Sequence, residues 1–459
     1  MKTIIGNTAT NAWGKVRVGD ALRLINGRAF KPSEWKERGL PIVRIQNLNN
    51  AEAPFNYYEG DLPERFLLNN GDLLFAWSGT PGTSFGAHIW RGGKAWLNQH
   101  IFKVMFDDID FNKKFLQLAI NQNLNEYIRA ADGGAGLALI TKGKFEDSEL
   151  VKPPLEEQNL IVAEIDKQFS RRDEAVASLK RVKANLKRYK AAVLKAAVEG
   201  NLTEDWRKLH PNVEPAGKLL DRILAERRAR WKGRGKYKEP DGPDTSNLIN
   251  LPKGWAWATA EQLTDETRAI TYGVIKLGPH MTDGIPVLRS SDVRSLHLEL
   301  QQVKRVAPGI AGRFKCTFLR GDEILVTVRG TLGGVVVAPR QCAGFNISRE
   351  VAMLALVDEE IAKAMAIFIA SGPTQRWLMQ RTKGIAYTGI NIETLKELPL
   401  PLPSIAEQQQ IVAEVERRLS VIDELAVVVE ANLTRADRLR QATLQKAFSG
   451  KLLLNGVYR

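Results

Sequence analysis

The residues most often used for metal or redox chemistry are few in this chain and widely scattered. The five histidines form no H-x-x-x-H or H-E-x-x-H pattern, and the two cysteines, Cys316 and Cys342, are too far apart for a C-x-x-C site. We therefore predict no metal ion and no disulfide framework, which favours a reducing, cytoplasmic compartment. No apolar run approaches the ~18 residues of a membrane span, and the first residues lack the apolar core of a signal peptide.

Motifs that bind nucleotides or transfer groups are also missing. There is no G-x-x-x-x-G-K-[ST] loop, and no lysine follows the glycine-rich run 330–334, which we interpret as a tight turn. There is no G-x-S-x-G elbow, and residues 151–154, Val-Lys-Pro-Pro, lack the side chains of the Asn-Pro-Pro-aromatic motif of amino-methyltransferases. The sequence therefore predicts a binding protein rather than an enzyme, with no cofactor held by this chain.

The balance of charges indicates what such a protein would bind. The 459 residues include 66 Lys and Arg against 52 Asp and Glu, which gives a formal net charge of +14. A surplus of this size favours a polyanionic partner, with nucleic acid ahead of a membrane surface. The hydrophobic fraction of 44% is ordinary for a globular protein, and the length suffices for two to four domains.

The chain contains an internal duplication. Residues 161–164, Ile-Val-Ala-Glu, recur unchanged as residues 411–414, and residues 194–200 resemble residues 444–450 at the same offset of 250. Further upstream, residues 39–44 resemble residues 284–289 at an offset of 245. A nearly constant offset predicts two copies of one unit of roughly 200–250 residues, too long for a solenoid repeat.

The first part of each copy has the pattern of a mixed α/β domain, because short apolar runs alternate with glycine and proline. The expected strands are Pro41–Ile45, Asp72–Ala76 and Ile101–Phe106 in copy one, and Pro286–Leu288, Glu323–Val328 and Val351–Leu356 in copy two. A helix is expected after the last strand of each copy, over Phe111–Ala131 and Glu359–Arg381.

The second part of each copy is predicted to be one long helix. It follows a proline stop, at residues 152–154 and 399–404, and Ser404 with Glu407 forms a capping-box pattern. Apolar residues then recur at spacings of three and four, up to Gly200 and Gly450. About 45 helical residues would form a rod of roughly 65–70 Å. Two such seams most simply pack on each other, in either a parallel or an antiparallel sense.

Residues 201–252 connect the two copies. The stretch Leu220–Lys238 is rich in arginine and lysine and is followed by a loop sequence, Glu239 to Asp244. Two interpretations are open: a solvated linker with a helical start, or a basic patch that touches DNA or an acidic partner.

This arrangement resembles the specificity subunit of type I restriction-modification enzymes. The motifs that carry the resemblance are Pro-Pro-Leu-Glu-Glu-Gln at 153–158, its counterpart ending in Glu407-Gln408, the stretch 191–207, and Pro-Lys-Gly-Trp at 252–255. Copy one opens at Ala12-Trp13-Gly14 and lacks the Pro-x-Gly-Trp of copy two, which blurs its first boundary.

The resemblance implies an α+β fold of two tandem α/β target-recognition domains, each followed by a long helix, with the two helices paired as an antiparallel coiled coil. The expected segments are a first recognition domain at 1–154, a central helix at 155–202, a basic linker at 203–250, a second recognition domain at 251–403 and a distal helix at 404–459.

The resemblance also implies a function. A specificity subunit catalyses nothing itself, and each domain reads one half of a bipartite DNA target. Two modification subunits, which carry S-adenosylmethionine, would methylate one adenine in each half. Two restriction subunits, which use ATP and Mg, would add translocation and cleavage.

Candidate DNA-binding residues are polar side chains in loops that follow the expected strands. Arg and Lys suit guanine, Asn and Gln suit adenine, and hydroxyls and amides suit phosphates. In copy one they are Arg44, Gln46, Asn47, Ser78, Gly79, Thr80, Thr141 and Lys142; in copy two they are Arg289, Ser290, Ser291, Asp292, Arg329, Gly330, Thr331, Tyr387, Thr388 and Asn391. The alternative for each is a polar residue that stabilises a turn.

Two further features have open interpretations. Residues 98–100, Asn-Gln-His, fit either a base-reading triplet or a strand-edge cap, and we favour the structural interpretation. The basic residues of the first long helix fit a solvated face, contacts to DNA between the half-sites, or contacts to modification subunits.

Two other classes of protein compete with this interpretation. A single-chain nuclease or methyltransferase with fused recognition domains is opposed by the missing motifs and by the length already assigned to domains and helices. A coiled-coil scaffold without a DNA role would differ in having no salt-sensitive affinity for DNA.

Overall fold

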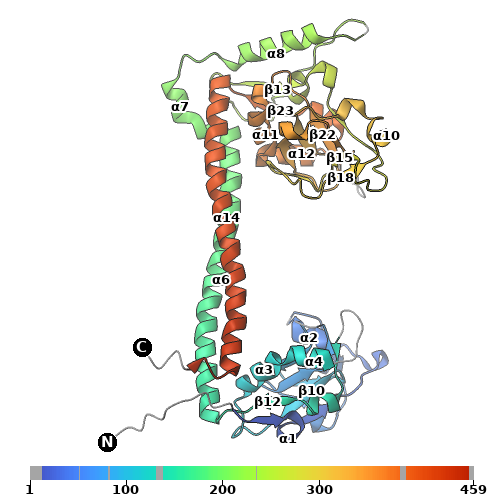
Figure 1. Cartoon of the computed structure of the whole chain (residues 1–459), viewed down its shortest axis with the longest axis vertical. Coiled ribbons are helices and arrows are strands. Elements are labelled where there is room, and N and C mark those ends of the chain that lie inside the picture. The colour runs from blue at the N-terminus through green and yellow to red at the C-terminus, as the bar shows by residue number, and fades with distance from the viewer. Residues whose placement is uncertain are drawn as a thin grey trace, which may run out of the picture. The chain divides into compact units, whose positions relative to one another are not determined.

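The fold consists of two compact units, which share the long helices. The computed structural model describes residues 13–50, 52–80, 83–130, 138–233, 235–382 and 389–453. The first unit combines Met1–Lys180 with Glu430–Arg459, and the second unit is Arg181–Val429. Each unit contains one mixed α/β domain and part of both long helices, α6 (Leu155–Val198) and α14 (Ile405–Phe448), as Figure 1 shows.

The first unit is built around two four-stranded sheets. One has the strand order β2-β10-β6-β8 and is antiparallel; the other has the order β4-β3-β9-β5, with β3 and β9 parallel. The strands are β1 (Lys15–Arg17), β2 (Arg23–Asn26), β3 (Leu40–Val43), β4 (Asn56–Tyr58), β5 (Leu67–Leu68), β6 (Leu73–Ala76), β7 (Ser78–Gly79), β8 (Gly86–Ile89), β9 (Ala95–Leu97), β10 (Ile101–Met105), β11 (Ala138–Leu139) and β12 (Glu149–Val151). The helices are α1 (Val18–Ala21), α2 (Ile45–Asn49), α3 (Lys113–Gln122), α4 (Leu124–Ala130) and α5 (Lys142–Glu146).

The second unit repeats this topology. Its four-stranded sheet, β14-β22-β19-β20, corresponds to β2-β10-β6-β8, and its sheet β18-β15-β21 corresponds to β4-β3-β9, including the parallel pair. The strands are β13 (Ala256–Thr259), β14 (Thr271–Tyr272), β15 (Ile285–Leu288), β16 (Val293–Arg294), β17 (His297–Leu298), β18 (Lys304–Val306), β19 (Ile324–Thr327), β20 (Val335–Val337), β21 (Asn346–Ile347), β22 (Val351–Leu354) and β23 (Pro399–Leu402). The shorter helices are α7 (Glu204–Leu209), α8 (Ala216–Arg230), α9 (Ala260–Leu263), α10 (Pro308–Ala311), α11 (Ala362–Ala370), α12 (Gly372–Gln380) and α13 (Ile392–Lys396).

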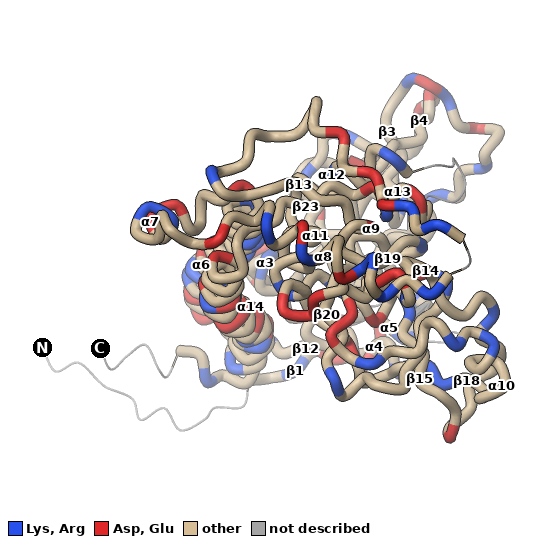
Figure 2. The backbone as a smooth tube through the Cα atoms, turned by 90° about the horizontal axis from the view of Figure 1, so that it is seen from above, with Lys and Arg blue, Asp and Glu red and all other residues tan. Residues whose placement is uncertain are grey.

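The two long helices lie side by side and run antiparallel within each unit. In the first unit, Thr443 donates to Gln168 over 3.1 Å, and Arg172 pairs with Asp437 at 2.6 Å. In the second unit, Lys190 lies 3.9 Å from Asp423. Partner numbers fall along α14 as they rise along α6, which confirms the tandem α/β fold with an antiparallel helix pair. In the view from above, basic and acidic residues are mixed around the ends of both helices (Figure 2).

The two helices expected after the last strands are each broken in two, so the prediction of a single helix was wrong in both copies. Asn123 ends α3, and α4 begins at the next residue. In the second unit, Ser371 ends α11 and Pro373 lies in the first turn of α12. Proline has no N–H for the helix ladder, and its ring clashes with the preceding turn, so one continuous helix cannot pass this position.

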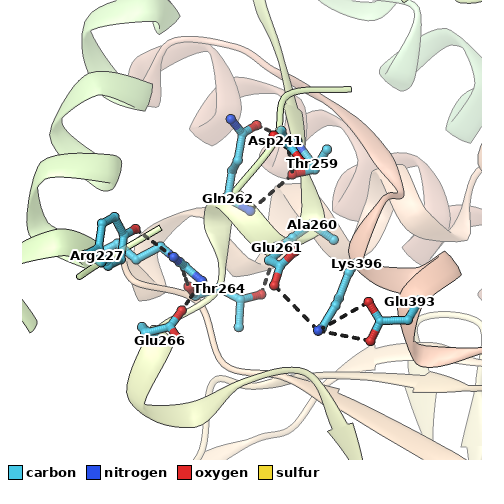
Figure 3. A network of polar contacts seen from close by, with 11 residues as sticks. Arg227, Asp241, Thr259, Ala260, Glu261, Gln262, Thr264, Glu266, Glu393 and Lys396 are labelled. Atoms are coloured by element: carbon cyan, nitrogen blue, oxygen red, sulfur yellow. Dashed lines mark hydrogen bonds and ion pairs between the residues drawn. The ribbon is translucent and has the colours of Figure 1, made fainter. Parts of the chain in front are cut away.

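The segment expected to be a basic linker contains helix α8, which packs on the second domain. Leu219 and Ile223 are buried in its core, and Arg227 is buried with its guanidinium paired to Glu266 and bonded to the carbonyl of Thr264 over 3.0 Å. Figure 3 shows this network. The segment thus has the helical start of the first interpretation, but this face of the helix is not solvated.

Among the residues that the structure describes, no helix has the length and hydropathy to cross a membrane, and no cluster of His, Cys, Asp or Glu is suited to hold a metal ion.

Candidate nucleic-acid interface

Arg44 follows β3 as the N-cap of the short helix α2, and Gln46 and Asn47 lie in the first turn of that helix. Asn47 is buried, and its Oδ1 accepts a hydrogen bond from the backbone N–H of Arg44 over 3.0 Å. Its Nδ2 donates to the carbonyl of Ala53 over 3.2 Å. Because both ends of the Asn47 amide are occupied, this side chain holds the turn. The exposed Gln46 donates to the carbonyl of Pro54 over 3.3 Å.

The same turn follows β15 in the second domain. Asp292 Oδ2 accepts from the backbone N–H of Arg289 over 2.8 Å and from its Nε over 3.1 Å, while Oδ1 accepts from its Nη2 over 3.0 Å. The hydrogen bond to Asp292 raises the pKa of the Arg289 guanidinium. Ser291 Oγ also donates to Asp292, over 3.0 Å. The charge of Arg289 is thus balanced locally.

Two of the candidate glycines allow close approach of neighbouring groups. Gly79 has φ +152°, and a Cβ there would lie 2.4 Å from Ser84 Oγ. Gly330 has φ +71°, and a Cβ would lie 2.8 Å from Ser290 Oγ. Their neighbours differ in exposure: Ser78 is buried, whereas Thr80, Arg329 and Thr331 are exposed.

The remaining candidates lie at helix starts. Thr141 caps α5 by accepting from the N–H of Lys144 over 3.4 Å, and Lys142 donates to the carbonyl of Leu24 over 3.2 Å. Asn391 precedes α13, is exposed, and makes no capping hydrogen bond. Tyr387 and Thr388 lie outside the described residues.

Some candidates come together in a cleft on each domain. The first cleft has a volume of about 150 Å³ and is lined by Phe30, Trp35, Arg44, Ile45, Gln46, Asn98, Gln99 and His100. The second cleft has a volume of about 640 Å³ and is lined by Tyr272, Val328, Arg329, Gly330, Arg349, Glu350, Gly389, Ile390, Asn391 and Ile392. The other described candidates do not line either cleft.

The second cleft carries basic side chains that form no ion pair within the part of the chain that the structure describes. The guanidinium of Arg329 lies over the ring of Tyr272, 5.8 Å from its centroid. Arg329 and the exposed Arg349 form no side-chain hydrogen bond or ion pair with any residue that the structure describes. Arginines of this kind remain available for phosphates or base edges.

Sequence reasoning missed part of each cleft. Gln99 and His100, which we had interpreted as structural, line the first cleft, and Arg349 and Glu350 line the second. The offset of 250 residues between the two copies could have revealed these residues. It makes 98–100 and 348–350 equivalent positions, directly before β10 and β22.

Comparison with known proteins identifies the family. The family model described as the type I restriction modification DNA specificity domain matches residues 11–182 and 276–424. This chain belongs to the type I restriction-modification specificity subunits. The EcoBI specificity subunit of Escherichia coli is 30% identical over 446 residues, which cover 96% of this chain and 86% of that protein. The EcoKI specificity subunit of Escherichia coli strain K12 is 24% identical, with 96% and 89% covered.

Solved structures agree with this family at the level of the fold. A chain from a study of complex assembly and conformational transition of the type I R-M system has a TM-score of 0.62 at 20% identity, covering 96% of this chain and 98% of that one. The HsdS subunit from Thermoanaerobacter tengcongensis has a TM-score of 0.50 at 18% identity, with 96% and 97% covered. As a member of this family by its sequence, the specificity subunit described here has a role in DNA sequence recognition.

Proposed function

We propose that this specificity subunit reads a bipartite DNA target, one half with each α/β domain, and directs adenine methylation by modification subunits. The observation that carries the proposal is the duplicated topology: each of the two domains has a cleft at the loop before its central strand, β10 or β22, although the rest of the lining differs between the two clefts. Two half-sites read jointly multiply their selectivity, since each mismatched base pair costs ~1–3 kcal/mol.

The long helices would link the two readers. Each helix has residues in both units, and a straight helix of 44 residues is about 66 Å long. Because one turn of B-DNA is ~34 Å, such a link suits half-sites one to two turns apart. The segments proposed for these roles are residues 1–154 and 251–403 for reading and residues 155–202 and 404–459 for spacing.

The chemistry would belong to partner subunits in the cytoplasm. Two modification subunits would bind S-adenosylmethionine, and two restriction subunits, where present, would use ATP and Mg for translocation and cleavage. The specificity chain would supply only DNA contacts and positioning. This agrees with its lack of the nucleotide-binding and group-transfer motifs named above and with its net charge of +14.

Modified-base sequencing tests this proposal. The chain is co-expressed with the methyltransferase encoded beside it, and the methylome is compared with that of the methyltransferase alone. We expect methylated adenines at one split motif only when the specificity chain is present. Identical methylation in both samples, with a soluble complex recovered, would contradict the proposal and favour a scaffold role.

A further inference from the structure

His100 and Glu350 occupy the same position in the duplicated fold. Each directly precedes the strand that pairs with β6 or β19, namely β10 or β22. The backbone carbonyl of His100 accepts from the N–H of Trp77 over 3.3 Å, and that of Glu350 accepts from the N–H of Val328 over 2.8 Å. Both residues line the cleft of their own domain.

The first cleft contains buried polar atoms that lack partners. Gln99 Oε1 and His100 Nδ1 are inaccessible to solvent and form no hydrogen bond to the described part of the chain. The imidazole is held beside the Trp77 ring, with the ring centroids 5.2 Å apart. Buried polar atoms are nearly always hydrogen bonded, because an unpaired one costs ~1–3 kcal/mol. Both side chains are otherwise partly exposed in the cleft, so a bound group would meet their accessible atoms.

The second cleft instead contains the carboxylate of Glu350, which is fixed by hydrogen bonds. Glu350 Oε2 accepts from Ser290 Oγ over 2.8 Å and from the Ser290 N–H over 3.3 Å. Gly330 allows this arrangement, since a Cβ would press on Ser290 Oγ. The other oxygen, Oε1, accepts no hydrogen bond from the described residues and is available to a ligand.

The two side chains would select different base edges. An ionised carboxylate only accepts hydrogen bonds, so it suits the amino groups of cytosine N4 or adenine N6 and is repelled by guanine O6 and N7. The first cleft has no carboxylate among its lining residues and has the guanidinium of Arg44, whose Nη1 donates to Asn56 Oδ1 over 3.0 Å. The second cleft has the Glu350 carboxylate beside Arg329 and Arg349, and we assign those two arginines to phosphates. Guanidinium donors match the two acceptors of guanine.

We propose that this position sets the base specificity of each half-site: Glu350 selects a base with an amino group, and His100, with Arg44, selects guanine. The inference rests on the proposed function, because it assigns residues to the two readers. It requires the two half-sites to differ at the base pair contacted from this loop.

The test uses the full chain in complex with its modification subunits. Glu350→Gln and His100→Gln place the same residue, able both to donate and to accept, in both domains. Each variant is co-expressed with the methyltransferase, and the methylated motif is read by modified-base sequencing. Glu360→Gln is the matched control, because this exposed carboxylate lies beyond the far end of β22 and outside the second cleft.

We expect each variant to relax one base position in one half-site, with guanine admitted in the Glu350→Gln motif and adenine admitted in the His100→Gln motif. The other half-site and the Glu360→Gln motif should be unchanged. If Glu350→Gln does not assemble, Ser290→Ala, which keeps the carboxylate but removes one of its donors, should relax the same position.

The outcomes separate this inference from the proposed function. An unmodified chain without any split motif would overturn the proposed function. The assembled Gln variants could instead methylate the same split motif, either fully or to a lower level. Either result would overturn the specificity roles of His100 and Glu350, while the proposed function would stand. An unchanged motif for Ser290→Ala would overturn the role of Glu350 in the same way.

Discussion

Trp255 donates a hydrogen bond from its indole Nε1 to Oε2 of Glu407 over 2.8 Å, and Glu407 lies in the first turn of α14. The first unit repeats this contact, where Trp13 donates to Glu157 Oε2 over 2.9 Å in the first turn of α6. The residue after each glutamate is Gln158 or Gln408, whose amide donates to the carbonyl of Pro153 or Pro403, both over 2.9 Å. The Glu-Gln pair therefore joins the opening of each domain to its proline stop and long helix.

The end of the other long helix packs on the same tryptophan in each unit. A Cβ at Gly200, which has φ +74°, would lie 3.3 Å from the Trp255 ring and only 2.4 Å from Pro252. A Cβ at Gly450 would lie 3.6 Å from the Trp13 ring. Each tryptophan thus lies where one helix begins and the other ends.

Glu407 has more hydrogen-bond and ion-pair partners than Glu157, which gives a first prediction about stability. Glu407 is buried and also accepts from Thr203 Oγ1 over 2.7 Å and from Arg207. Replacing one partner of a buried ion pair typically costs ~3 kcal/mol or more, whereas one hydrogen bond contributes ~1 kcal/mol. We expect Glu407→Ala to lower the free energy of unfolding clearly more than Glu157→Ala. Hydrogen exchange in the first turns of α14 and α6 measures this, and equal effects would contradict it.

The elements of this region could be predicted from sequence, but their contacts could not. Proline stops and glycine ends placed the long helices because those residues limit the backbone directly. The partners of Glu407 come from residues 152 to 204 positions away. The capping-box pattern was only half confirmed: Ser404 Oγ accepts from the N–H of Glu407 over 3.3 Å, but the Glu407 carboxylate is used by Trp255, Thr203 and Arg207.

The candidate site shows the same limit. Judged by residue type, Asn47 and Arg329 were both candidates for binding DNA. The Asn47 amide, however, is hydrogen bonded to the backbone of Arg44 and Ala53, whereas the Arg329 guanidinium only lies over the Tyr272 ring. What separates them is the geometry of the loop, and one sequence does not give that geometry. The 250-residue offset points to the loop before β22, but only the pairing of β22 places Glu350 beside Ser290.

The turn contacts of Asn47 and Asp292 give a second prediction. Each side-chain oxygen accepts from the backbone N–H three residues earlier, over 3.0 Å and 2.8 Å. Asp292→Asn keeps an oxygen for this bond, whereas Asp292→Ala removes it at a cost of ~1 kcal/mol. We expect faster hydrogen exchange of the Arg289 amide in Asp292→Ala and a smaller change in Asp292→Asn. Asn47→Ala and Asn47→Asp should show the same order at Arg44, and the reverse order would be inconsistent with this role.

The arginines of the second domain give a third prediction. Arg329, which lies over the Tyr272 ring, and Arg349 form no ion pair with the described residues, whereas Arg289 is neutralised by Asp292. Each phosphate contact adds about 1 to the slope of log affinity against log salt. We expect Arg329→Ala and Arg349→Ala to lower that slope by about 1 each. The change should be smaller for Arg289→Ala and for the control Arg340→Ala, since Arg340 pairs with Asp322 outside the cleft. DNA-binding titrations of the assembled complex at several salt concentrations measure the slopes, and a full unit lost with Arg340→Ala would refute this assignment.

The histidines of the first domain give a fourth prediction, on pH. Burial, and then the charge of Arg44, lower the pKa of His100 from its usual 6.5, and burial lowers the pKa of His88 despite its hydrogen bond to the carbonyl of Ser84. Below pH 6.5 the unfolded chain therefore binds protons that the folded domain does not yet accept. The stability these neutral rings provide is complete above pH 6.5 and is lost as the pH falls through their lowered folded-state pKa values. We expect the first unit to lose stability between pH 7 and 5, while His100→Gln and His88→Gln each reduce that dependence. Denaturant unfolding followed by hydrogen exchange in each unit measures this, and an unchanged pH profile in both variants would show that other groups set it.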